Sequence, residues 1–352
     1  MRFGLQFFPD VRPDQKSGAD YFRDALSLAE EADELGFSHI RIVEHYFHYY
    51  GGYSPNPMLF LAAAAQRTRR ARLVTGAVLP VFNHPLKLAG EIGMLDAISG
   101  GRLDVGFGRA FLPHEFRRFG RSAEESIARF REGIEQVELS ADPRERDPPG
   151  SFSLDREHDI AAAPHAKAAS QIPRRGAEHG RFFRFCRPHG VFGHGDPAGR
   201  GRDAAVARRL SRRLEGRRAP WRGRGYAGVP HVLRCRWRSR PGLRLPVHRR
   251  LSPLVEAASD WLDRRTSQDY PGYDRVIAKL RQSRAADQIG SGAAWIGSAE
   301  EIVDQIRRTR DAFGRYEHAS LQVNFNMVPL HDALASMRLF AEQVMPHFTR
   351  TE

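Results

Sequence analysis

Hydrophobic positions in the first 139 residues fall into two kinds of pattern. Short runs rich in β-branched and aromatic residues alternate with longer stretches in which apolar residues recur every three or four positions. The short runs predict buried strands, and the longer period predicts amphipathic helices. We expect strands at Phe3–Phe8, His39–Val43, Ala71–Leu79 and Arg102–Phe107, and helices at Tyr21–Leu35, Pro57–Arg67, Pro85–Ile98 and Ala123–Leu139. This alternation predicts four successive βα units around a parallel sheet.

The same alternation returns near the C-terminus. The run AAWIGSAEEIVDQI predicts a short strand and a helix, with Ser298 as the N-cap and Glu300 and Glu301 in the first turn, where they complement the helix dipole. The run HASLQVNF, from His318, predicts a last strand, and LHDALASMRLFAEQVMP a closing amphipathic helix. Residues 252–290 have a helical pattern. Together these segments would supply the last units of an eight-unit α/β barrel.

The segment from about residue 140 to 250 interrupts the pattern. Residues 141–250 hold 25 Arg and one Lys against ten acidic residues, a balance of +16, so the rest of the chain carries about −3 of the overall +13. The segment also contains 11 of the 22 prolines and hardly a run of four β-forming residues. A barrel needs its fifth and sixth strands here, and we expect them to be missing or disrupted.

Two hypotheses account for this segment. One is a basic insertion that binds the phosphates of nucleic acid, although the segment lacks regular aromatic interleaving and a recognisable RNA-binding motif.

The other hypothesis is translation in a shifted reading frame, which can be examined because the first two bases of most codons are fixed. In the +1 frame RLSRRLEGRRAP, from Arg209, can become DYRAAWKAAGH, a helix-forming text that ends at a glycine. LRCRWRSRPGL can likewise become FDADGDRARAY, and PHAKAASQIP can become PTQRPHPKF.

Little in the composition points to a membrane, a disulfide or a metal. The apolar N-terminal run is stopped by Pro9 and Asp10 before a signal-peptide core could form, and no run is long enough to cross a bilayer. Cys186 and Cys235 are too few for a disulfide framework and lack metal-ligand spacing. We therefore expect a cytoplasmic protein without a metal site.

Four motifs resemble the bacterial luciferase-like family of flavin-dependent monooxygenases. They are IRIVEHYFHYYGGYSPNP from Ile40, VTGAVLPVFNHPLKLAGEIGMLDAISGGRLDVGFGRAF from Val74, HEFRRFG from His114, and the C-terminal pair WIGSAEEIVDQI and MRLFAEQVMP. The resemblance covers everything outside the interrupted segment. It implies one (β/α)₈ TIM-barrel domain, with its first half in residues 1–139, an interruption at 140–250 and the remaining units in 251–352.

The resemblance also implies a catalytic residue and a phosphate anchor. His45 directly follows a predicted strand, at the barrel end where active sites form, and matches the family's active-site histidine. An imidazole can act as acid or base near neutral pH. Arg109 resembles the arginine that grips the phosphate of FMN, a task that suits a permanently charged group with paired donors. Gly108, Ala110 and Phe111 would add backbone contacts.

The remaining site residues have structural alternatives. Thr75 and Gly76 lie where the family often has an unusual, sometimes non-prolyl cis, peptide against the flavin ring, but Gly76 could equally relieve crowding inside the barrel. Tyr46 and Glu115 could line a substrate pocket. For Tyr46 the alternative is an aromatic loop packed on the barrel rim. For Glu115 the alternative is a solvated loop carboxylate.

By resemblance, the chain would use reduced FMN from a separate flavin reductase, together with O₂, on a small apolar organic substrate. Relatives commonly form homodimers or heterodimers. An F420-dependent oxidoreductase of the same barrel family is an alternative, as is a degenerate barrel without activity. In relatives the fifth strand supplies backbone donors to the phosphate, so a disrupted strand would leave Arg109 without them and impair activity in this chain.

The frame-shift hypothesis predicts a difference in reading frame between this gene and the genes of its close relatives. Sequencing should reveal one insertion or deletion near codon 140 and a compensating one near codon 250, with the +1 frame continuous in relatives. An unbroken frame shared with close relatives, without compensating changes, would leave the basic insertion as the explanation.

Overall fold

The computed structural model describes residues 1–141, 294–313, 318–324 and 328–349, with the single residues 257, 275, 278, 290 and 292. The strands are β1 (Arg2–Phe7), β2 (His39–Ile42), β3 (Arg72–Thr75), β4 (Leu103–Asp104) and β5 (His318–Leu321). The helices are α1 (Gly18–Glu34), α2 (Pro57–Arg67), α3 (Pro85–Ser99), α4 (Pro113–Arg118), α5 (Ser126–Ala141), α12 (Ala299–Phe313), α13 (Leu330–Leu339) and α14 (Pro346–Thr349). Single turns η1 (Pro80–Phe82), η2 (Ala123–Glu125) and η5 (Phe340–Val344) complete the list.

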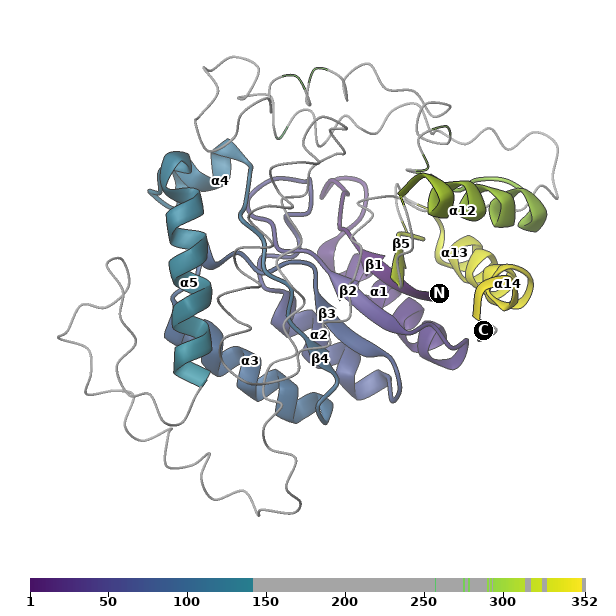
Figure 1. The fold of residues 1–352 in the computed structure, drawn as a ribbon, viewed down its shortest axis with the longest axis horizontal. Helices are drawn as coiled ribbons and strands as arrows, with labels where there is room; N and C mark the ends of the chain where they lie inside the picture. The colour runs from purple at the N-terminus through teal and green to yellow at the C-terminus, as the bar shows by residue number, and fades with distance from the viewer. Residues whose placement is uncertain are drawn as a thin grey trace.

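The five described strands form one parallel sheet in the order β4-β3-β2-β1-β5. The strand at the N-terminus therefore lies between its sequence neighbour β2 and the last strand β5, where Arg2 pairs with His318. Helices lie outside this sheet, with α12, α13 and α14 beside β5, and the two chain ends are close together (Figure 1). The predicted parallel α/β arrangement is confirmed for the described units.

Alternation along the strands separates an apolar face from a polar face. Apolar side chains such as Phe3, Leu5 and Ile40 belong to the core that the helices share. Because successive side chains point to opposite faces of a strand, the intervening positions face the barrel interior. Polar residues fill many of them: the ring of His39 contacts the Ser320 hydroxyl at 2.7 Å, and Arg72 forms a bidentate pair with Asp104.

Local signals in the sequence explain where several helices begin and end. The side chains of Ser17 and Asn56 cap α1 and α2 by accepting hydrogen bonds from backbone N–H groups of the first turn. Gly100 ends α3 with a φ of 66°, a left-handed conformation that favours glycine. The predicted cap at Ser298 is confirmed, because Glu301 N–H donates to the Ser298 hydroxyl and the Glu301 carboxylate accepts from Ser298 N–H.

Two predicted strands are shorter than expected. The strand expected at Ala71–Leu79 ends at Thr75, and the strand expected at Arg102–Phe107 keeps only Leu103 and Asp104 in the ladder. The reason lies in a side chain: the Thr75 hydroxyl accepts from Gly106 N–H at 2.7 Å and donates to Gly106 C=O at 2.9 Å, replacing the backbone ladder. A single bridge between Val78 and Phe107 follows, beyond a cis peptide between Gly76 and Ala77.

Among the described residues of the run AAWIG, where a strand was predicted, only Gly297 takes part in a β-bridge. The N–H of Ile296 donates to the side chain of Gln305 at 2.8 Å, and the Gln305 amide donates back to Ile296 C=O at 2.8 Å, so a helix side chain takes the bonds that a strand would make. The helix predicted from Ala123 begins at Ser126 after the turn η2, and α4 was not predicted. The closing helix is confirmed, with a π turn at Phe340–Val344.

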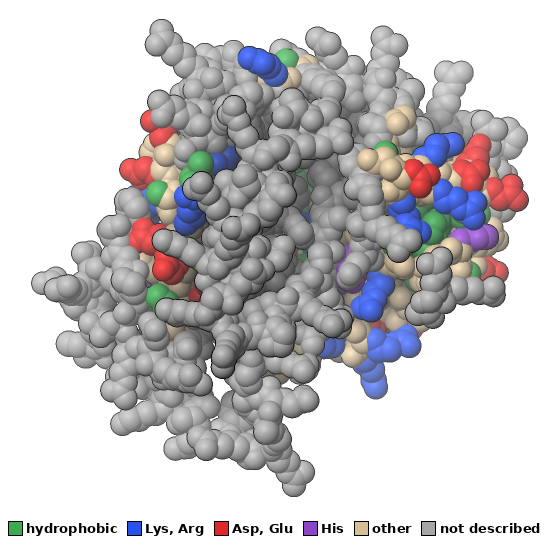
Figure 2. All heavy atoms as spheres, viewed as in Figure 1, with side chains coloured by type: hydrophobic (Ala, Val, Ile, Leu, Met, Phe, Trp, Pro, Cys, Tyr) green, Lys and Arg blue, Asp and Glu red, His purple; other side chains and the backbone are tan. Residues whose placement is uncertain are grey.

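Acidic and basic side chains are mixed on the described surface, at both edges of the view in Figure 2. The predictions for residues 142–250, and for most of 252–290, lie outside the described residues. Within the part that is described, no helix is both long and apolar enough to span a membrane.

The interior histidine His39 gives the fold a predictable pH dependence. Burial, followed by the charges of His318 and Arg41, holds the pKa of His39 well below its usual 6.5. Unfolded His39 takes up a proton near pH 6.5 but the folded form does not. The contribution of neutral His39 to the free energy of unfolding is therefore fully present above pH 6.5 and is lost as the pH falls below 6.5. Between pH 7.5 and 5.5, the stability deficit of His39→Gln relative to wild type should shrink by up to about 1.4 kcal/mol.

Denaturant unfolding at both pH values measures this difference. The variant His331→Gln is the matched control because the His331 side chain is exposed, so this variant removes an imidazole without removing a buried one. A deficit of His39→Gln that is the same at both pH values would contradict the prediction.

Candidate active site

The carboxyl ends of β2, β3 and β4 meet at one end of the barrel. Backbone hydrogen bonds hold the loops that leave these strands: Gly76 N–H donates to Ile42 C=O at 2.7 Å, and Gly108 N–H donates to Val78 C=O at 2.8 Å. In parallel α/β barrels this end carries the active site. The sequence-predicted residues 75–76 and 108–111 therefore lie in neighbouring loops at the same end as His45.

His45 follows β2 and is almost fully buried, with 7% of its surface exposed. Its backbone N–H donates to Ser54 C=O at 3.0 Å, which folds the loop back over it. The rings of Phe8, Tyr50 and Phe111 lie 5.5, 5.2 and 6.0 Å from the imidazole, centroid to centroid. Three aromatic walls therefore surround the ring and keep bulk water from most of it.

Gly51 fixes how closely the loop can approach His45. Its φ of 76° lies in the left-handed region, and a Cβ added there would come within 2.7 Å of His45 Cδ2. A side chain at this position would push the imidazole away. Sequence reasoning did not single out Gly51, although it lies in the GG pair of the YFHYYGGYSPNP run.

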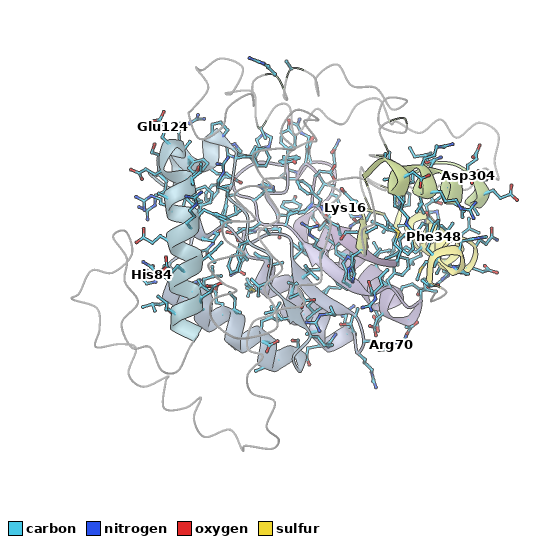
Figure 3. The ribbon with its side chains drawn as sticks, in the orientation of Figure 1. Lys16, Arg70, His84, Glu124, Asp304 and Phe348 are labelled. Atoms are coloured by element: carbon cyan, nitrogen blue, oxygen red, sulfur yellow. The ribbon has the colours of Figure 1, made fainter. Side chains whose placement is uncertain are left out.

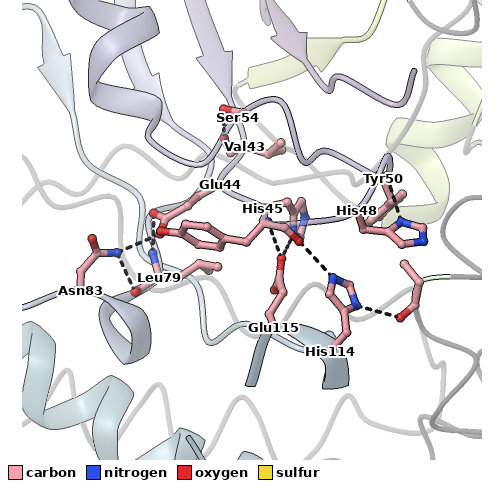
Figure 4. A network of polar contacts seen from close by, with 12 residues as sticks. Val43, Glu44, His45, His48, Tyr50, Ser54, Leu79, Asn83, His114 and Glu115 are labelled. Carbon is pink, nitrogen blue, oxygen red and sulfur yellow. Dashed lines mark hydrogen bonds and ion pairs between the residues drawn. The ribbon is translucent and has the colours of Figure 1, made fainter. Parts of the chain in front are cut away.

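Glu115 lies against His45, although 70 positions separate the two in the chain. The carboxylate comes from the short helix α4 and is fully buried, with 0% exposed. Its Oε1 lies 3.1 Å from His45 Nδ1 and accepts a hydrogen bond from Tyr46 N–H at 2.8 Å (Figure 4). The structure thus places Glu115 behind the histidine, and the solvated loop carboxylate considered as its alternative is wrong.

A second buried carboxylate, Glu44, joins the loops after β2 and β3. It accepts hydrogen bonds from the Tyr46 hydroxyl at 2.5 Å, the Asn83 amide at 2.8 Å and Leu79 N–H at 3.0 Å, as Figure 4 shows. Burial raises the pKa of Glu44 to about 8, and the charge of Glu115 contributes in the same direction. Sequence reasoning missed Glu44 and Asn83, because their partners are set by long-range contacts.

The other predicted residues have mixed surroundings. Thr75 bonds to the backbone of the next strand, and a Cβ on Gly76 would collide with the side chain of Arg41, which agrees with the crowding alternative. Ala110, next to Arg109, has a φ of 57°. That conformation costs a non-glycine residue roughly 1–2 kcal/mol, and such strain concentrates at functional sites.

Tyr46 is part of the wall of the site. Its hydroxyl donates to Glu44, and its ring packs edge-on against Phe82 and Phe119 at 5.9 and 4.7 Å between centroids. This agrees with an aromatic loop packed on the barrel rim. The backbone carbonyl of Tyr46 also contacts Nε2 of His114 at 3.1 Å, a histidine that sequence reasoning did not single out.

Charged side chains of this site do not form a metal centre. Within the described ranges, no group of three or more His, Cys, Asp or Glu side chains could hold a metal ion. The described groups at this end of the barrel include Arg109, backbone N–H groups of glycines and small residues, and the apolar faces of aromatic rings. This set is suited to a flat, anionic organic cofactor.

Residues 1–173 match the family described as luciferase-like monooxygenases. The crystal structure of monooxygenase RslO1 from Streptomyces bottropensis is 36% identical and covers 99% of this chain and 100% of its own, with a TM-score of 0.62. The chain belongs to the luciferase-like monooxygenase family, and its fold is the luciferase-like α/β barrel.

Two further comparisons concern flavin proteins. The oxygenase component of flavin-dependent trigonelline monooxygenase from Acinetobacter baylyi is 37% identical over 139 residues, which is 39% of this chain but only 38% of that relative. The oxygenating constituent of 3,6-diketocamphane monooxygenase from Pseudomonas putida, solved with FMN, is 20% identical, covers 98% of each chain and has a TM-score of 0.62. At that identity the likeness supports the fold alone.

The raised pKa of Glu44 predicts how stability changes with pH. A carboxyl whose pKa is about 8 in the folded protein, against 4.5 unfolded, makes the protein less stable as the pH rises towards 8, because the unfolded state releases its proton first. Glu44→Gln removes this titration. As the pH rises from 6 to 8, the free energy of unfolding of Glu44→Gln should therefore rise relative to that of wild type by about 2 kcal/mol.

Urea titrations at the two pH values test this, with Glu124→Gln as the control. Glu124 is exposed in η2, just before α5 (Figure 3), so its substitution removes a carboxylate without removing a buried one. If wild type and Glu44→Gln keep a constant difference from pH 6 to 8, Glu44 does not titrate as expected.

Proposed function

We propose that the chain is a flavin-dependent monooxygenase that uses reduced FMN and O₂ on a small, apolar organic substrate. The observation that carries the proposal is a buried imidazole, His45, held at the carboxyl end of a parallel sheet inside a wall of aromatic rings. Family membership supports it. In this proposal His45 is the acid/base group and Arg109 is the phosphate anchor.

The residues present fit FMN in their chemistry. Arg109 offers a permanent charge and paired donors for a phosphate, and Gly76 and Gly108 bring the backbone of two neighbouring loops to the barrel end. Thr75, Ala110 and Phe111 complete this set. FMN, when bound, supplies the redox chemistry with O₂. The chain binds and orients the reactants, excludes water through Phe8, Tyr50 and Phe111, and moves a proton at His45.

The same wall sets the expected class of substrate. Phe111 and Tyr50 present apolar faces next to the imidazole, and the hydroxyl of Tyr46 is already bonded to Glu44. An aromatic pocket with one titratable nitrogen favours a small apolar molecule with a single polar group. Glu115 and Tyr46 shape this pocket from behind His45.

We further propose two protein partners. A separate flavin reductase would supply the reduced FMN, and the similarity to a relative that is named as an oxygenase component supports this partner. A second copy of the chain, or a related subunit, would cover apolar side chains that α2 and α3 leave exposed: Leu59 is 73% exposed and Met94 68%, with Leu86 and Ile98 beside them in the chain. Exposed apolar patches commonly mark such interfaces.

Flavin binding tests the cofactor assignment. Wild type should bind FMN more tightly than riboflavin, which lacks the phosphate. Arg109→Ala should weaken FMN about 10- to 100-fold, because charge-assisted hydrogen bonds contribute about 1.5–3 kcal/mol each, and should leave riboflavin binding nearly unchanged. Quenching of flavin fluorescence measures both affinities, and Arg131→Ala, an exposed arginine of α5, is the matched control.

Turnover is measured with reduced FMN from an added reductase, following ¹⁸O₂ incorporation into a panel of apolar ketones, aldehydes and terpenes. His45→Gln should keep FMN affinity and lose turnover. Equal affinities of wild type for FMN and riboflavin would contradict the proposal. Tight binding of F420 in place of FMN would favour the F420-dependent alternative.

A further inference from the structure

We propose that Glu115 is a positioning residue that holds His45 in one tautomer, with the proton on Nδ1 and the acceptor nitrogen, Nε2, left for the reaction. The inference rests on the proposed role of His45. It is carried by three observations: the fully buried carboxylate, its 3.1 Å contact with Nδ1, and the shared hydrogen bond from Tyr46 N–H at 2.8 Å.

The tautomer follows from the direction of these hydrogen bonds. A backbone N–H can only donate, so Oε1 of Glu115 must be an acceptor towards Tyr46. An ionised carboxylate has no proton to give to the imidazole either, so His45 Nδ1 is the donor. When the ring is neutral, the lone pair is therefore on Nε2, which makes no hydrogen bond to any residue that the structure describes.

The negative charge of Glu115 has a second effect. When Nε2 takes a proton, the ring becomes an imidazolium next to a carboxylate in a site from which water is largely excluded. Opposite charges attract more strongly in such a medium than in water. The same arrangement of imidazole and orienting carboxylate recurs in Ser-His-Asp catalytic triads.

A merely structural role would not require a charge here. A neutral group could accept the hydrogen bond from Tyr46 N–H, and burying a carboxylate is costly unless it is well paired. The second oxygen, Oε2, is buried without a hydrogen-bond partner among the described residues, so the carboxylate is not arranged for maximal pairing. The cost makes sense if the charge acts on His45.

The surrounding residues hold the imidazole of His45 against the carboxylate of Glu115. Ser54 C=O holds the backbone N–H of His45 at 3.0 Å, and Gly51 lies so close to the ring that a Cβ would contact it. The ring of Phe111 closes another side at 6.0 Å. His45 therefore has little freedom to turn away from the carboxylate.

Two substitutions separate the hydrogen bond from the charge. Glu115→Gln keeps the shape and, because Tyr46 N–H requires an acceptor, keeps its carbonyl oxygen towards His45. It should preserve the Nδ1–H tautomer while lowering kcat about 10- to 100-fold, a typical part of a general acid–base contribution. Glu115→Ala should lose both the tautomer preference and at least as much of kcat, and added formate should restore part of the rate.

The spectroscopic readout needs no turnover. The ¹⁵N shifts of histidine-labelled protein, with the His45 signals assigned by their loss in His45→Gln, report which nitrogen carries the proton. Wild type and Glu115→Gln should carry it on Nδ1, and Glu115→Ala should show a mixture. Glu124→Gln is the control for loss of one carboxylate charge and should behave as wild type in both measurements.

The outcomes distinguish this inference from the proposed function. A proton on Nε2 in the wild type, or an unchanged tautomer in Glu115→Ala, would overturn the inference whether or not the chain oxygenates a substrate. Wild-type kcat in Glu115→Gln would reduce Glu115 to a structural role. If instead wild type has the Nδ1–H tautomer but no FMN-dependent turnover, the positioning of His45 holds and the proposed function fails.

Discussion

Parallel strand pairing is the constraint on which the rest of this protein depends. Because the described strands all run in one direction, the loops after β2, β3 and β4 must open on the same end, and residues from distant parts of the chain meet there. The helices cover the outer face, where Phe3, Leu5 and Ile40 are buried. The polar side chains of the candidate site thereby gather at the carboxyl end, where His45 and Glu115 meet.

The parts of the fold that depend on local pattern could be predicted from the sequence. Helices α1, α2 and α3, strands β1, β2 and β5, and the cap at Ser298 were expected within a few residues, since periodicity and capping act over a few positions. The strand predicted within AAWIG is limited to a bridge at Gly297 among its described residues, because Gln305 satisfies the backbone of Ile296, a contact that no local pattern reveals. The early end of β3 also results from a side chain, because the Thr75 hydroxyl bonds to the backbone of Gly106.

Sequence reasoning placed His45 after a strand, but it did not identify the side chains that His45 contacts. His45 could be placed at the barrel end because it directly follows a strand. Its pairing with Glu115 depends on how the short helix α4 docks, and the buried cluster of Glu44 depends on two loops meeting. Buried polar groups with long-range partners conflict with the local preference for apolar residues, and such conflicts concentrate where function requires them.

The position of β1 has a consequence for how the chain is made. Arg2 pairs with His318, so β1 obtains its second neighbour only after residue 318 has been synthesised. Contacts of such sequence separation are slow to form, and an unpaired strand edge is a template for association with other chains. A nascent or truncated molecule would therefore depend on chaperones for solubility, whatever the intervening residues encode.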